Sequence, residues 1–302
     1  MPDPLPTALP PHPNPRRPSW SPPAGATDTH FHVFGPPSRF PYAPTRRYEP
    51  PAAPFEHWES MAQVCGIERG VVVQPTAHGT DPSAILDAVT RADGRLRAVT
   101  AIDEQVSDDL LDELAGRGVV GARFSLMHDR SGAVADIERA VDRLAARGWS
   151  LDLHVEPAAL LDNEQLLREL PVPVVIDHLA RIRPSGGLGQ PALALLLDLL
   201  REPHVWVKVS CADKISDVPV ARPADGSLPF LDVVPLARAA IEVAPERVLW
   251  GTDWPHGNTF ERRRVPDDGD LVDLLAEFAP DESQRRRILV DNPARLYGFP
   301  SR

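Results

Sequence analysis

Short runs of apolar and β-branched residues recur along the chain from residue 26 onward, and longer amphipathic stretches separate them. Runs of this kind are typical of strands that are buried on both faces, as in a parallel sheet. We therefore expect eight strands, within ATDTHFHVF (26–34), GVVVQP (70–75), LRAVTAI (96–102), VVGARFSL (119–126), SLDLHV (150–155), PVVIDH (173–178), VWVKVSC (205–211) and RVLWGTD (247–253).

Most intervals between these runs have the spacing of an amphipathic helix. Gly148 suits a C-terminal stop, and the apolar positions that share one helical face before it are Ile137, Ala140, Val141, Leu144 and Ala145. Strands that alternate with helices predict a parallel sheet, and eight such units close a barrel. An open doubly wound sheet is the alternative. Against it, no G-x-G-x-x-G motif follows the first run, and the glycines of 186–189 are interpreted as a flexible loop.

The N-terminal segment has a different composition. The chain has 35 prolines, and they are concentrated before residue 55. Proline has no amide donor and the segment has little apolar mass, so we expect residues 1–24 to be an extended, flexible tail and residues 25–302 to form one barrel domain. The pair Arg16 and Arg17 invites a twin-arginine export interpretation, but no apolar region follows it, so a cytoplasmic location is expected.

Charge and length limit the class of partner. The 302 residues have a formal net charge of −11, which disfavours nonspecific binding to nucleic acid or to an anionic membrane. No apolar run approaches the roughly 20 residues that span a bilayer. The two cysteines, Cys65 and Cys211, exclude a disulfide scaffold and a four-thiolate zinc site. A small organic substrate is the expected partner, and the oligomeric state is left open.

Polar residues that strand patterning does not explain stand at the carboxyl ends of the expected strands. That edge is where the active sites of β/α barrels are built. His30 and His32 are two residues apart, which places both imidazoles on one side of an extended chain. His154, His178 and Asp253 end the fifth, sixth and eighth strands. We therefore expect four histidines and one carboxylate to surround one site.

The ordered motifs of the chain resemble the amidohydrolase superfamily, in the amidohydrolase-related branch that contains 2-pyrone-4,6-dicarboxylate lactonase. The matching segments span about residues 26–299 and read TDTHFHVFG, FPYAPTRRYEP, VVVQPTAHG, GARFS, VIDHLAR, VKVSC, LWGTDWPHGN and DNPARLYG. This resemblance implies a distorted (β/α)8 TIM barrel that acts on a lactone, commonly one with carboxylate groups. It also implies a catalytic set of Asp253, His30, His32 and His178.

The cofactor is left between two alternatives. Metal-free lactonases of this branch have a tyrosine where His154 stands, whereas metal-binding amidohydrolases have a histidine there. The resemblance thus makes one divalent ion, such as zinc, possible on His30, His32, His154 and Asp253, while metal-free catalysis fits nearly as well. The fourth strand ends without an obvious bridging lysine or glutamate, which favours one metal over two.

Candidate substrate contacts come partly from the resemblance and partly from position. Tyr48, Thr76 and Arg123 match substrate-contacting positions, and Arg123 offers a planar fork for a carboxylate at a strand end. Lys214 follows the seventh strand, and His256 stands three residues after Asp253. The structural alternatives are a salt bridge for Arg123 and a packed aromatic for Tyr48. Two further observations concern residues outside this set: Lys208 is expected in the barrel wall, and Asp129 stands where the lactonase pattern has a second arginine.

The leading hypothesis is a hydrolase that opens a small carboxylated lactone. Asp253 would activate water, and the histidines would stabilise the developing oxyanion. Two other interpretations are a metal-dependent decarboxylase or isomerase of the same superfamily, and a catalytically silent barrel that binds a small acid.

Overall fold

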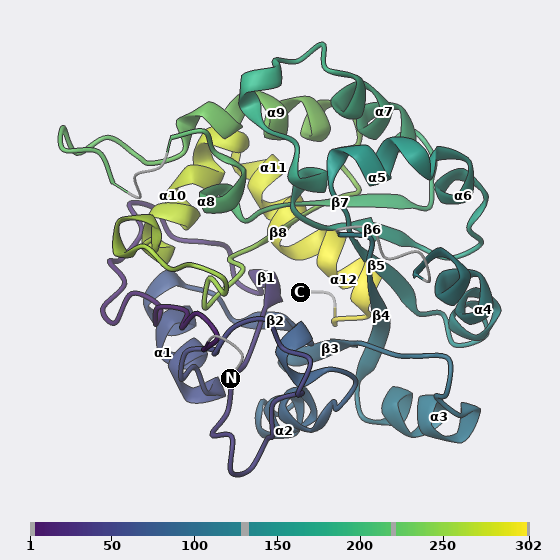
Figure 1. The fold of residues 1–302 in the computed structure, drawn as a ribbon. Helices are drawn as coiled ribbons and strands as arrows, with labels where there is room; N and C mark the ends of the chain where they lie inside the picture. The colour runs from purple at the N-terminus through teal and green to yellow at the C-terminus, as the bar shows by residue number, and fades with distance from the viewer. Residues whose placement is uncertain (1–3, 128–132, 219–221, 301–302) are drawn as a thin grey trace.

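The computed structural model describes residues 4–127, 133–218 and 222–300, and it contains one eight-stranded parallel sheet (Figure 1). Each strand pairs with the next in chain order, so the expected barrel is confirmed and the doubly wound alternative is wrong. The strands are β1 (Thr27–Phe31), β2 (Arg69–Val73), β3 (Leu96–Thr100), β4 (Val119–Ser125), β5 (Ser150–His154), β6 (Val174–Ile176), β7 (Val205–Ser210) and β8 (Val248–Gly251).

The barrel closes where β8 meets β1. The backbone amide of Asp253 donates to the carbonyl of His30 at 2.8 Å, and the amide of His32 donates to the carbonyl of Trp254 at 2.7 Å. The pairing of β1 with β2 shifts in register between Asp28 and Phe31, which gives the barrel the distortion that the family resemblance implied. The seam therefore places the carboxyl end of β1 directly beside that of β8.

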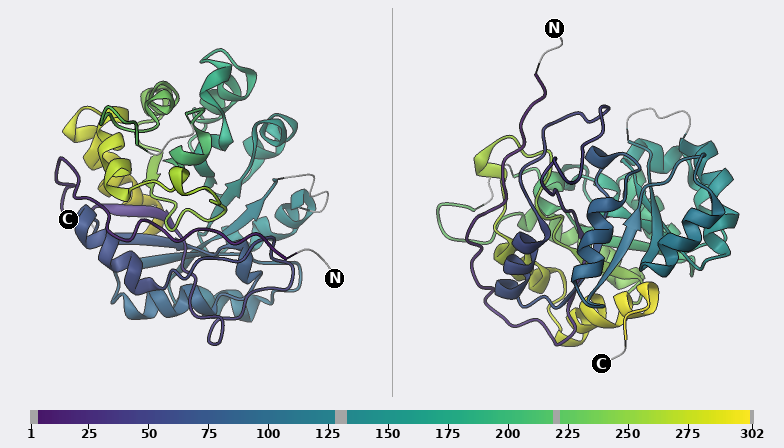
Figure 2. Two further views of the ribbon diagram at one scale, coloured as in Figure 1. Left: turned by 60° about the vertical axis from the view of Figure 1, so that its left-hand side comes forward. Right: turned by 90° about the horizontal axis from the view of Figure 1, so that it is seen from below.

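Helices surround the sheet (Figures 1 and 2), and most of them bury apolar residues on one face. In α4, Ile137 and Leu144 are fully buried, as the spacing predicted, whereas Ala145 of the same predicted face is exposed. The helices are α1 (Phe55–Cys65), α2 (Ser83–Arg91), α3 (Asp108–Gly116), α4 (Ala133–Ala145), α5 (Pro157–Asp162), α6 (Glu164–Glu169), α7 (Pro191–Leu199), α8 (Ala212–Ile215), α9 (Val234–Val243), α10 (Asp268–Phe278), α11 (Glu282–Arg286) and α12 (Asn292–Tyr297). Short helical turns are η1 (Thr76–His78), η2 (Asp177–Arg181), η3 (Pro184–Gly186), η4 (Leu231–Val233), η5 (Arg262–Arg264) and η6 (Arg287–Asp291).

Alternation along each strand divides the core in two. Val72 of β2 packs in the large cluster between sheet and helices. Its neighbours Val71 and Val73 pack in a smaller cluster with Tyr297 and Phe299 from the end of the chain. The C-terminal segment thus fills the barrel at the end opposite to the carboxyl ends of the strands, which leaves that other end for a site.

The N-terminal segment is extended, as expected, but it lies against the barrel. In the left view of Figure 2 this purple segment runs across the molecule. Its residue Arg16 forms ion pairs with Asp270 and Asp273 of α10, and the indole of Trp20 donates to the carbonyl of Val272 at 3.1 Å. These contacts argue against a free tail, and the division of the chain at residue 25 stays a prediction. Within the described residues, no helix is long and apolar enough to cross a membrane.

Candidate active site

Four of the expected side chains meet at the carboxyl ends of β1, β6 and β8. One oxygen of Asp253, Oδ1, lies 3.7 Å from Nε2 of His30, 3.5 Å from Nε2 of His32 and 3.7 Å from Nε2 of His178. All four residues are buried. The structure therefore brings together residues that are more than 200 positions apart, and the carboxylate oxygen is their common neighbour.

The other nitrogen of each imidazole is held by the barrel wall. Nδ1 of His32 lies 2.7 Å from the carbonyl oxygen of Val73, so it must donate, and Nε2 of a neutral His32 carries the lone pair. Nδ1 of His178 lies 2.8 Å from the hydroxyl of Ser210, which accepts or donates. Nδ1 of His30 lies 3.2 Å from both Asp177 Oδ1 and Lys208 Nζ. Each ring is thus oriented with Nε2 toward Asp253.

Electrostatics keep this carboxylate ionised, and burial keeps the imidazoles of His30 and His178 neutral. Burial alone would raise the pKa of Asp253, but the imidazoles of His178, His32 and His30 outweigh burial and hold that pKa well below its usual range. Burial lowers the pKa of His30 to about 3 and that of His178 well below its usual value. The second oxygen of Asp253 accepts from the thiol of Cys211 at 3.2 Å. An ionised carboxylate at this position can accept a proton, which is the function of a general base.

A network of buried charges contacts the imidazole of His30 through Asp177 and Lys208. The ammonium of Lys208 lies 2.6 Å from Asp152 Oδ2 and 3.1 Å from Asp177 Oδ1, and all three side chains are fully buried. Nε of Arg123 donates to the other oxygen of Asp177 at 3.0 Å. Two cations thus balance two carboxylates. Lys208 lies in the barrel wall, as expected, and Arg123 makes the salt bridge that was its structural alternative.

Left-handed backbone marks the points where the strands end. φ is 54° at His178, 60° at Cys211 and 62° at Asp253, although none of these residues is glycine. Such a conformation costs roughly 1–2 kcal/mol per residue, and it is concentrated at functional sites. The turns redirect the side chains from the strand faces toward the end of the barrel.

The donor set fits one divalent metal ion. His30, His32 and Asp253 form one of the three groups of potential ligands in the described residues. A tetrahedral ion with bonds of about 2.0–2.2 Å separates its ligand atoms by about 3.3–3.6 Å, close to the observed 3.5 and 3.7 Å. Nε2 of His30 is buried without a hydrogen-bond partner, as a free ligand atom would be. His154 is in none of these groups, and the guanidinium of Arg181 lies 3.3 Å from its Nε2.

Tyr48, Lys214 and Thr76, which were predicted to contact the substrate, differ in burial and in their partners. Tyr48 is buried, and burial together with the charge of Asp253 raises the pKa of its phenol, as expected for a neighbour of the site. Lys214 contacts the hydroxyl of Thr259 and lies 3.4 Å from Asp213. Thr76 is exposed at the first position of η1.

His256 does not line the opening. It is fully buried, and its Nε2 lies 3.1 Å from Asp268 Oδ1 on α10. The cis peptide between Trp254 and Pro255 precedes it in the same turn. The position noted at Asp129, with its neighbours His128 and Arg130, lies outside the described residues.

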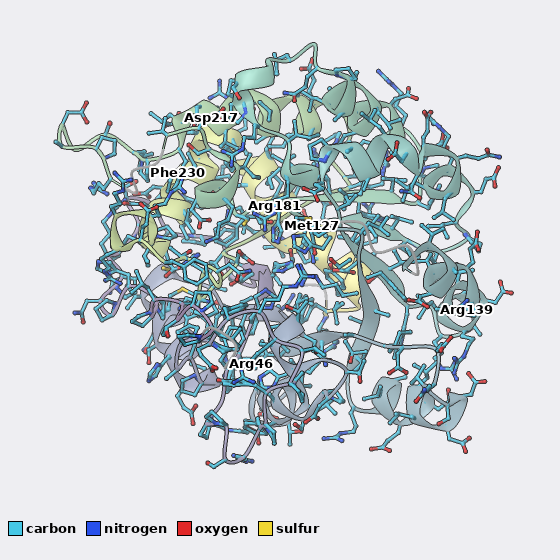
Figure 3. All side chains as sticks on the ribbon, viewed as in Figure 1. Arg46, Met127, Arg139, Arg181, Asp217 and Phe230 are labelled. Carbon is cyan, nitrogen blue, oxygen red and sulfur yellow. The ribbon has the colours of Figure 1, made fainter. Side chains whose placement is uncertain are left out.

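Sequence reasoning missed three participants. Ser210 and Asp177 anchor imidazoles, and Arg181, labelled over the central part of the barrel in Figure 3, donates to His154. Arg181 stands three residues after His178, which was the one signal available in the text. Ser210 and Asp177 adjoin predicted site residues, but a strand pattern does not reveal which imidazole each one holds.

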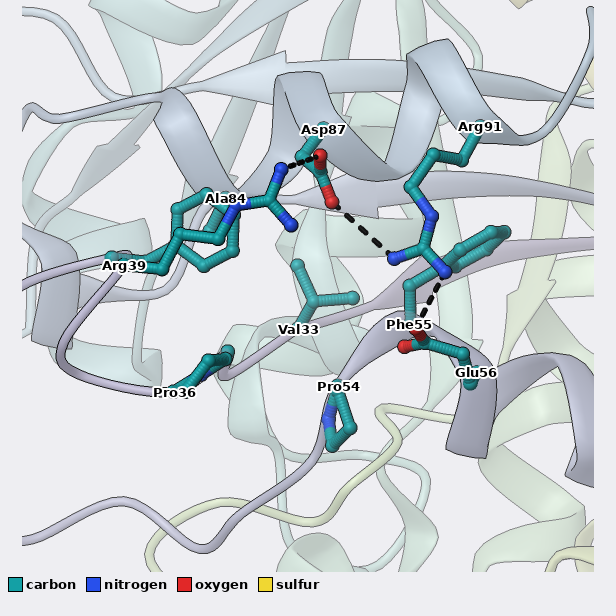
Figure 4. A pocket seen from close by; sticks show the side chains of 11 residues that line it. Val33, Pro36, Arg39, Pro54, Phe55, Glu56, Ala84, Asp87 and Arg91 are labelled. Atoms are coloured by element: carbon teal, nitrogen blue, oxygen red, sulfur yellow. Dashed lines mark hydrogen bonds and ion pairs between the residues drawn. The ribbon is translucent and has the colours of Figure 1, made fainter.

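A separate pocket of about 160 Å³ lies outside the barrel, between α1, α2 and the segment after β1 (Figure 4). Asp87 receives both Arg39, at 2.6 Å, and Arg91, at 3.4 Å, and Arg91 also pairs with Glu56. The charges of this pocket therefore compensate one another, and it contains none of the catalytic candidates.

Comparisons with known proteins agree with this geometry. The Amidohydrolase family model matches residues 27–299. A 4-sulfomuconolactone hydrolase of Hydrogenophaga intermedia is 45% identical over 279 residues, which are 91% of this chain and 89% of the relative. A 2-pyrone-4,6-dicarboxylate hydrolase of Comamonas testosteroni is 38% identical over 94% of this chain and 93% of its own.

A solved structure of a probable 2-pyrone-4,6-dicarboxylic acid hydrolase from Acinetobacter baumannii, with citric acid bound, superposes with a TM-score of 0.77. The match has 26% identity and covers 91% of this chain and all of that one. Family model, relatives and fold agree over nearly the whole length. The chain therefore belongs to the amidohydrolase family.

Proposed function

We propose that the protein is a hydrolase that opens a small carboxylated lactone by attack of water. The observation that carries the proposal is the single oxygen of Asp253 that faces three imidazole nitrogens at 3.5–3.7 Å. Two relatives at 38–45% identity are lactone hydrolases by name, which supports the same reaction here. This support favours hydrolysis over decarboxylation, isomerisation or binding without turnover.

In the proposed reaction, Asp253 takes a proton from a water molecule, whose oxygen attacks the lactone carbonyl carbon. His178 donates to the carbonyl oxygen in the tautomer in which the hydroxyl of Ser210 donates to Nδ1, because the ring proton is then on Nε2. The lone pair of His32 Nε2 orients the water. The ring C–O bond then breaks, and the proton held by Asp253 passes to the departing ring oxygen. Water is consumed, and the product is an open-chain acid.

A divalent ion, if bound, would be held by His30, His32 and Asp253 and would supply Lewis-acid polarisation of the carbonyl. The lone pair on His32 Nε2 and the unpaired Nε2 of His30 favour this addition. Elemental analysis of the purified protein tests it. About one ion per chain is expected, with less in His32→Asn protein, and a protein that is fully active without metal would contradict this part of the proposal.

Asp253→Asn tests the role of the base. The amide cannot accept the proton, so kcat/KM should fall by about 10²–10⁴-fold while the far-UV circular dichroism spectrum is unchanged. Ring opening is followed by base uptake on a panel of carboxylated lactones. Asp103→Asn, at an exposed residue after β3, is the matched control and should retain full activity. Retention of wild-type turnover by Asp253→Asn, or carbon dioxide release in place of base uptake, would overturn the assignment.

A further inference from the structure

Residues near the start of the chain pair with the loop after β1. The amide of Ala8 donates to the carbonyl of Glu49 at 3.0 Å, and the amide of Glu49 donates to the carbonyl of Pro6 at 2.9 Å. These two bonds form a parallel β-bridge between Thr7 and Glu49. Ala8 is only 3% exposed, so the bridge is packed as well as hydrogen-bonded. The N-terminal segment is therefore anchored directly beside Tyr48.

The same segment also binds the loop after β8. The amide of Leu9 donates to the carbonyl of Thr259 at 2.8 Å. In an extended chain successive residues face opposite sides, so the neighbouring amides of Ala8 and Leu9 can bind different partners. Two loops that are more than 200 positions apart are thus joined by one short segment. We call residues 6–9 the N-terminal clasp.

Each of the two loops holds a side chain that was predicted to contact the substrate. Tyr48 precedes Glu49 in the loop after β1. The buried hydroxyl of Thr259, in the loop after β8, contacts the ammonium of Lys214. The phenol also reaches this second loop, since a Cβ at Gly257 would lie 3.1 Å from the hydroxyl oxygen of Tyr48. The clasp therefore joins the loops at the point where these predicted contacts are held.

The catalytic candidates are fixed by other contacts. The imidazole of His178 is held by Ser210 at the end of β7, and the backbone of Asp253 pairs with that of His30 at the barrel seam. These contacts belong to the strands and do not involve the N-terminal segment. A change in the clasp should therefore affect binding of the substrate more than the chemical step.

The sequence of the clasp favours this docking. Pro6 precedes the donating residues, and Pro10 and Pro11 follow them. Because proline fixes φ, ordering a segment of this composition costs less conformational entropy than ordering an ordinary loop. The clasp lies outside residues 27–299, which the family model matches, so it is an addition of this chain to the matched domain.

We propose that the N-terminal clasp holds Tyr48 and Lys214 in position at the opening of the barrel and thereby sets the affinity of the site for its substrate. This inference rests on the proposed function, since both side chains are its predicted substrate contacts. Each loop is bound by a different amide of one short segment, so loss of either bond separates the two loops. The clasp acts through these side chains and is a positioning element.

Proline substitutions test the clasp, because in an extended segment they remove one amide donor and keep the direction of the chain. Ala8→Pro removes the donor to Glu49, and Leu9→Pro removes the donor to Thr259. In each variant KM for 4-carboxymethylbut-2-en-4-olide should rise about three- to tenfold, while kcat changes by less than about twofold. Thr7→Pro is the matched control and should change neither value, because the amide of Thr7 makes none of these three bonds.

The double variant, with both Ala8→Pro and Leu9→Pro, distinguishes one link from two separate anchors. For one link, the double variant should raise KM by less than about twofold beyond the larger single effect. A rise equal to the product of the two single effects would overturn the proposal. Wild-type KM in both single variants would also overturn it, as would a loss confined to kcat.

Trypsin cleavage after Arg47 tests the clasp without a substrate. This exposed residue adjoins Tyr48 and the β-bridge, and a protease must first free the loop from its partners. Cleavage should be at least about threefold faster in Ala8→Pro and Leu9→Pro protein than in wild type or Thr7→Pro, with the urea midpoint unchanged. Equal rates in all four proteins would overturn the proposal.

The two readouts also separate this inference from the proposed function. Absence of turnover in wild-type protein would count against the hydrolase, and the affinity for the same lactone, measured by calorimetry, would then take the place of KM. A loss of affinity of about three- to tenfold in Leu9→Pro protein, together with faster cleavage, supports the clasp even then. Equal affinities in wild-type and Leu9→Pro protein would count against the clasp whether or not the ring is opened.

Discussion

At the scale of single residues, the role of a charged side chain depends on whether it already has a partner of opposite charge. Arg123 and Arg181 are both arginines at strand ends, and their side chains differ in whether a carboxylate is already bound. Lys208 illustrates the structural extreme, because its ammonium is fully buried between two carboxylates and a histidine. Removing one member of such a network leaves the others buried and unpaired.

Lys208→Met should therefore lower the free energy of unfolding by about 3–5 kcal/mol, since Asp152 and Asp177 would lose their shared partner. Urea unfolding followed by circular dichroism measures the change. Arg201→Met removes an exposed pair with Asp198 and should cost less than about 1 kcal/mol. Equal losses of unfolding free energy in the two variants would show that the buried network stabilises the protein no more than an exposed ion pair does.

At the scale of elements, contacts with the start of α10 hold the N-terminal segment against the barrel. The start of α10 meets residues 16–19 through Asp267, Asp270 and Asp273, and Gly269 permits this close approach. A Cβ at Gly269 would lie 2.0 Å from the carbonyl oxygen of Arg16, which is far inside contact distance. The helix and the segment thus fit only because this residue has no side chain.

Gly269→Ala should displace the segment and expose the bond after Arg16 to trypsin, with cleavage at least about tenfold faster than in wild type. Gel electrophoresis over time measures the rate. Gly116→Ala, where a Cβ would meet nothing within 4 Å, is the control. Rapid cleavage of wild-type protein at the same bond would instead support the freely flexible tail expected from composition.

Acid sensitivity is a property of the whole molecule. Burial lowers the pKa of His30 to about 3, and it lowers those of His154 and His178 well below the usual value. The unfolded chain would protonate these groups near pH 6.5, so below that pH it binds protons that the folded state does not. Each contributes up to about 1.4 kcal/mol of lost stability per pH unit.

Two groups act in the opposite sense. Burial raises the pKa of Asp28 to about 6, so the folded state binds a proton there that the unfolded state lacks between about pH 4 and 6. Asp268 outweighs burial and raises the pKa of His256, and the stability from that pair is fully present below about pH 6.5 and lost above it. Between pH 6 and 4, His30, His154 and His178 all destabilise the folded state, whereas only Asp28 of the two opposing groups acts in this range. The free energy of unfolding is therefore predicted to fall between pH 6 and 4.

The free energy of unfolding, measured in urea from pH 4 to 8, should therefore fall on the acid side. His178→Asn should flatten that fall, because one of the three protons no longer distinguishes the two states. A profile that is level from pH 6 to 4, or an unchanged slope in His178→Asn protein, would show that these imidazoles are protonated in the folded state.

Local pattern by itself determined a large part of this protein. Eight apolar runs and their spacing predicted the barrel, because burial on both faces imposes a continuous apolar strand. Parallel strands also share one carboxyl edge, so His30, His32, His178 and Asp253 could be placed together before any coordinates. These four residues could be assigned to the site because each stands at the end of a predicted strand.

The tertiary structure alone decided how the charges pair. Arg123, the predicted anion contact, donates from Nε to Asp177, and the guanidinium of Arg181 lies beside Nε2 of His154, the candidate ligand. The proline-rich segment lies on α10 because three aspartates and one glycine meet it there. Each of these outcomes depends on contacts between residues of different strands, helices and loops. Periodicity reports only which face of an element is buried, whereas the partner of a buried charge is a neighbour in space.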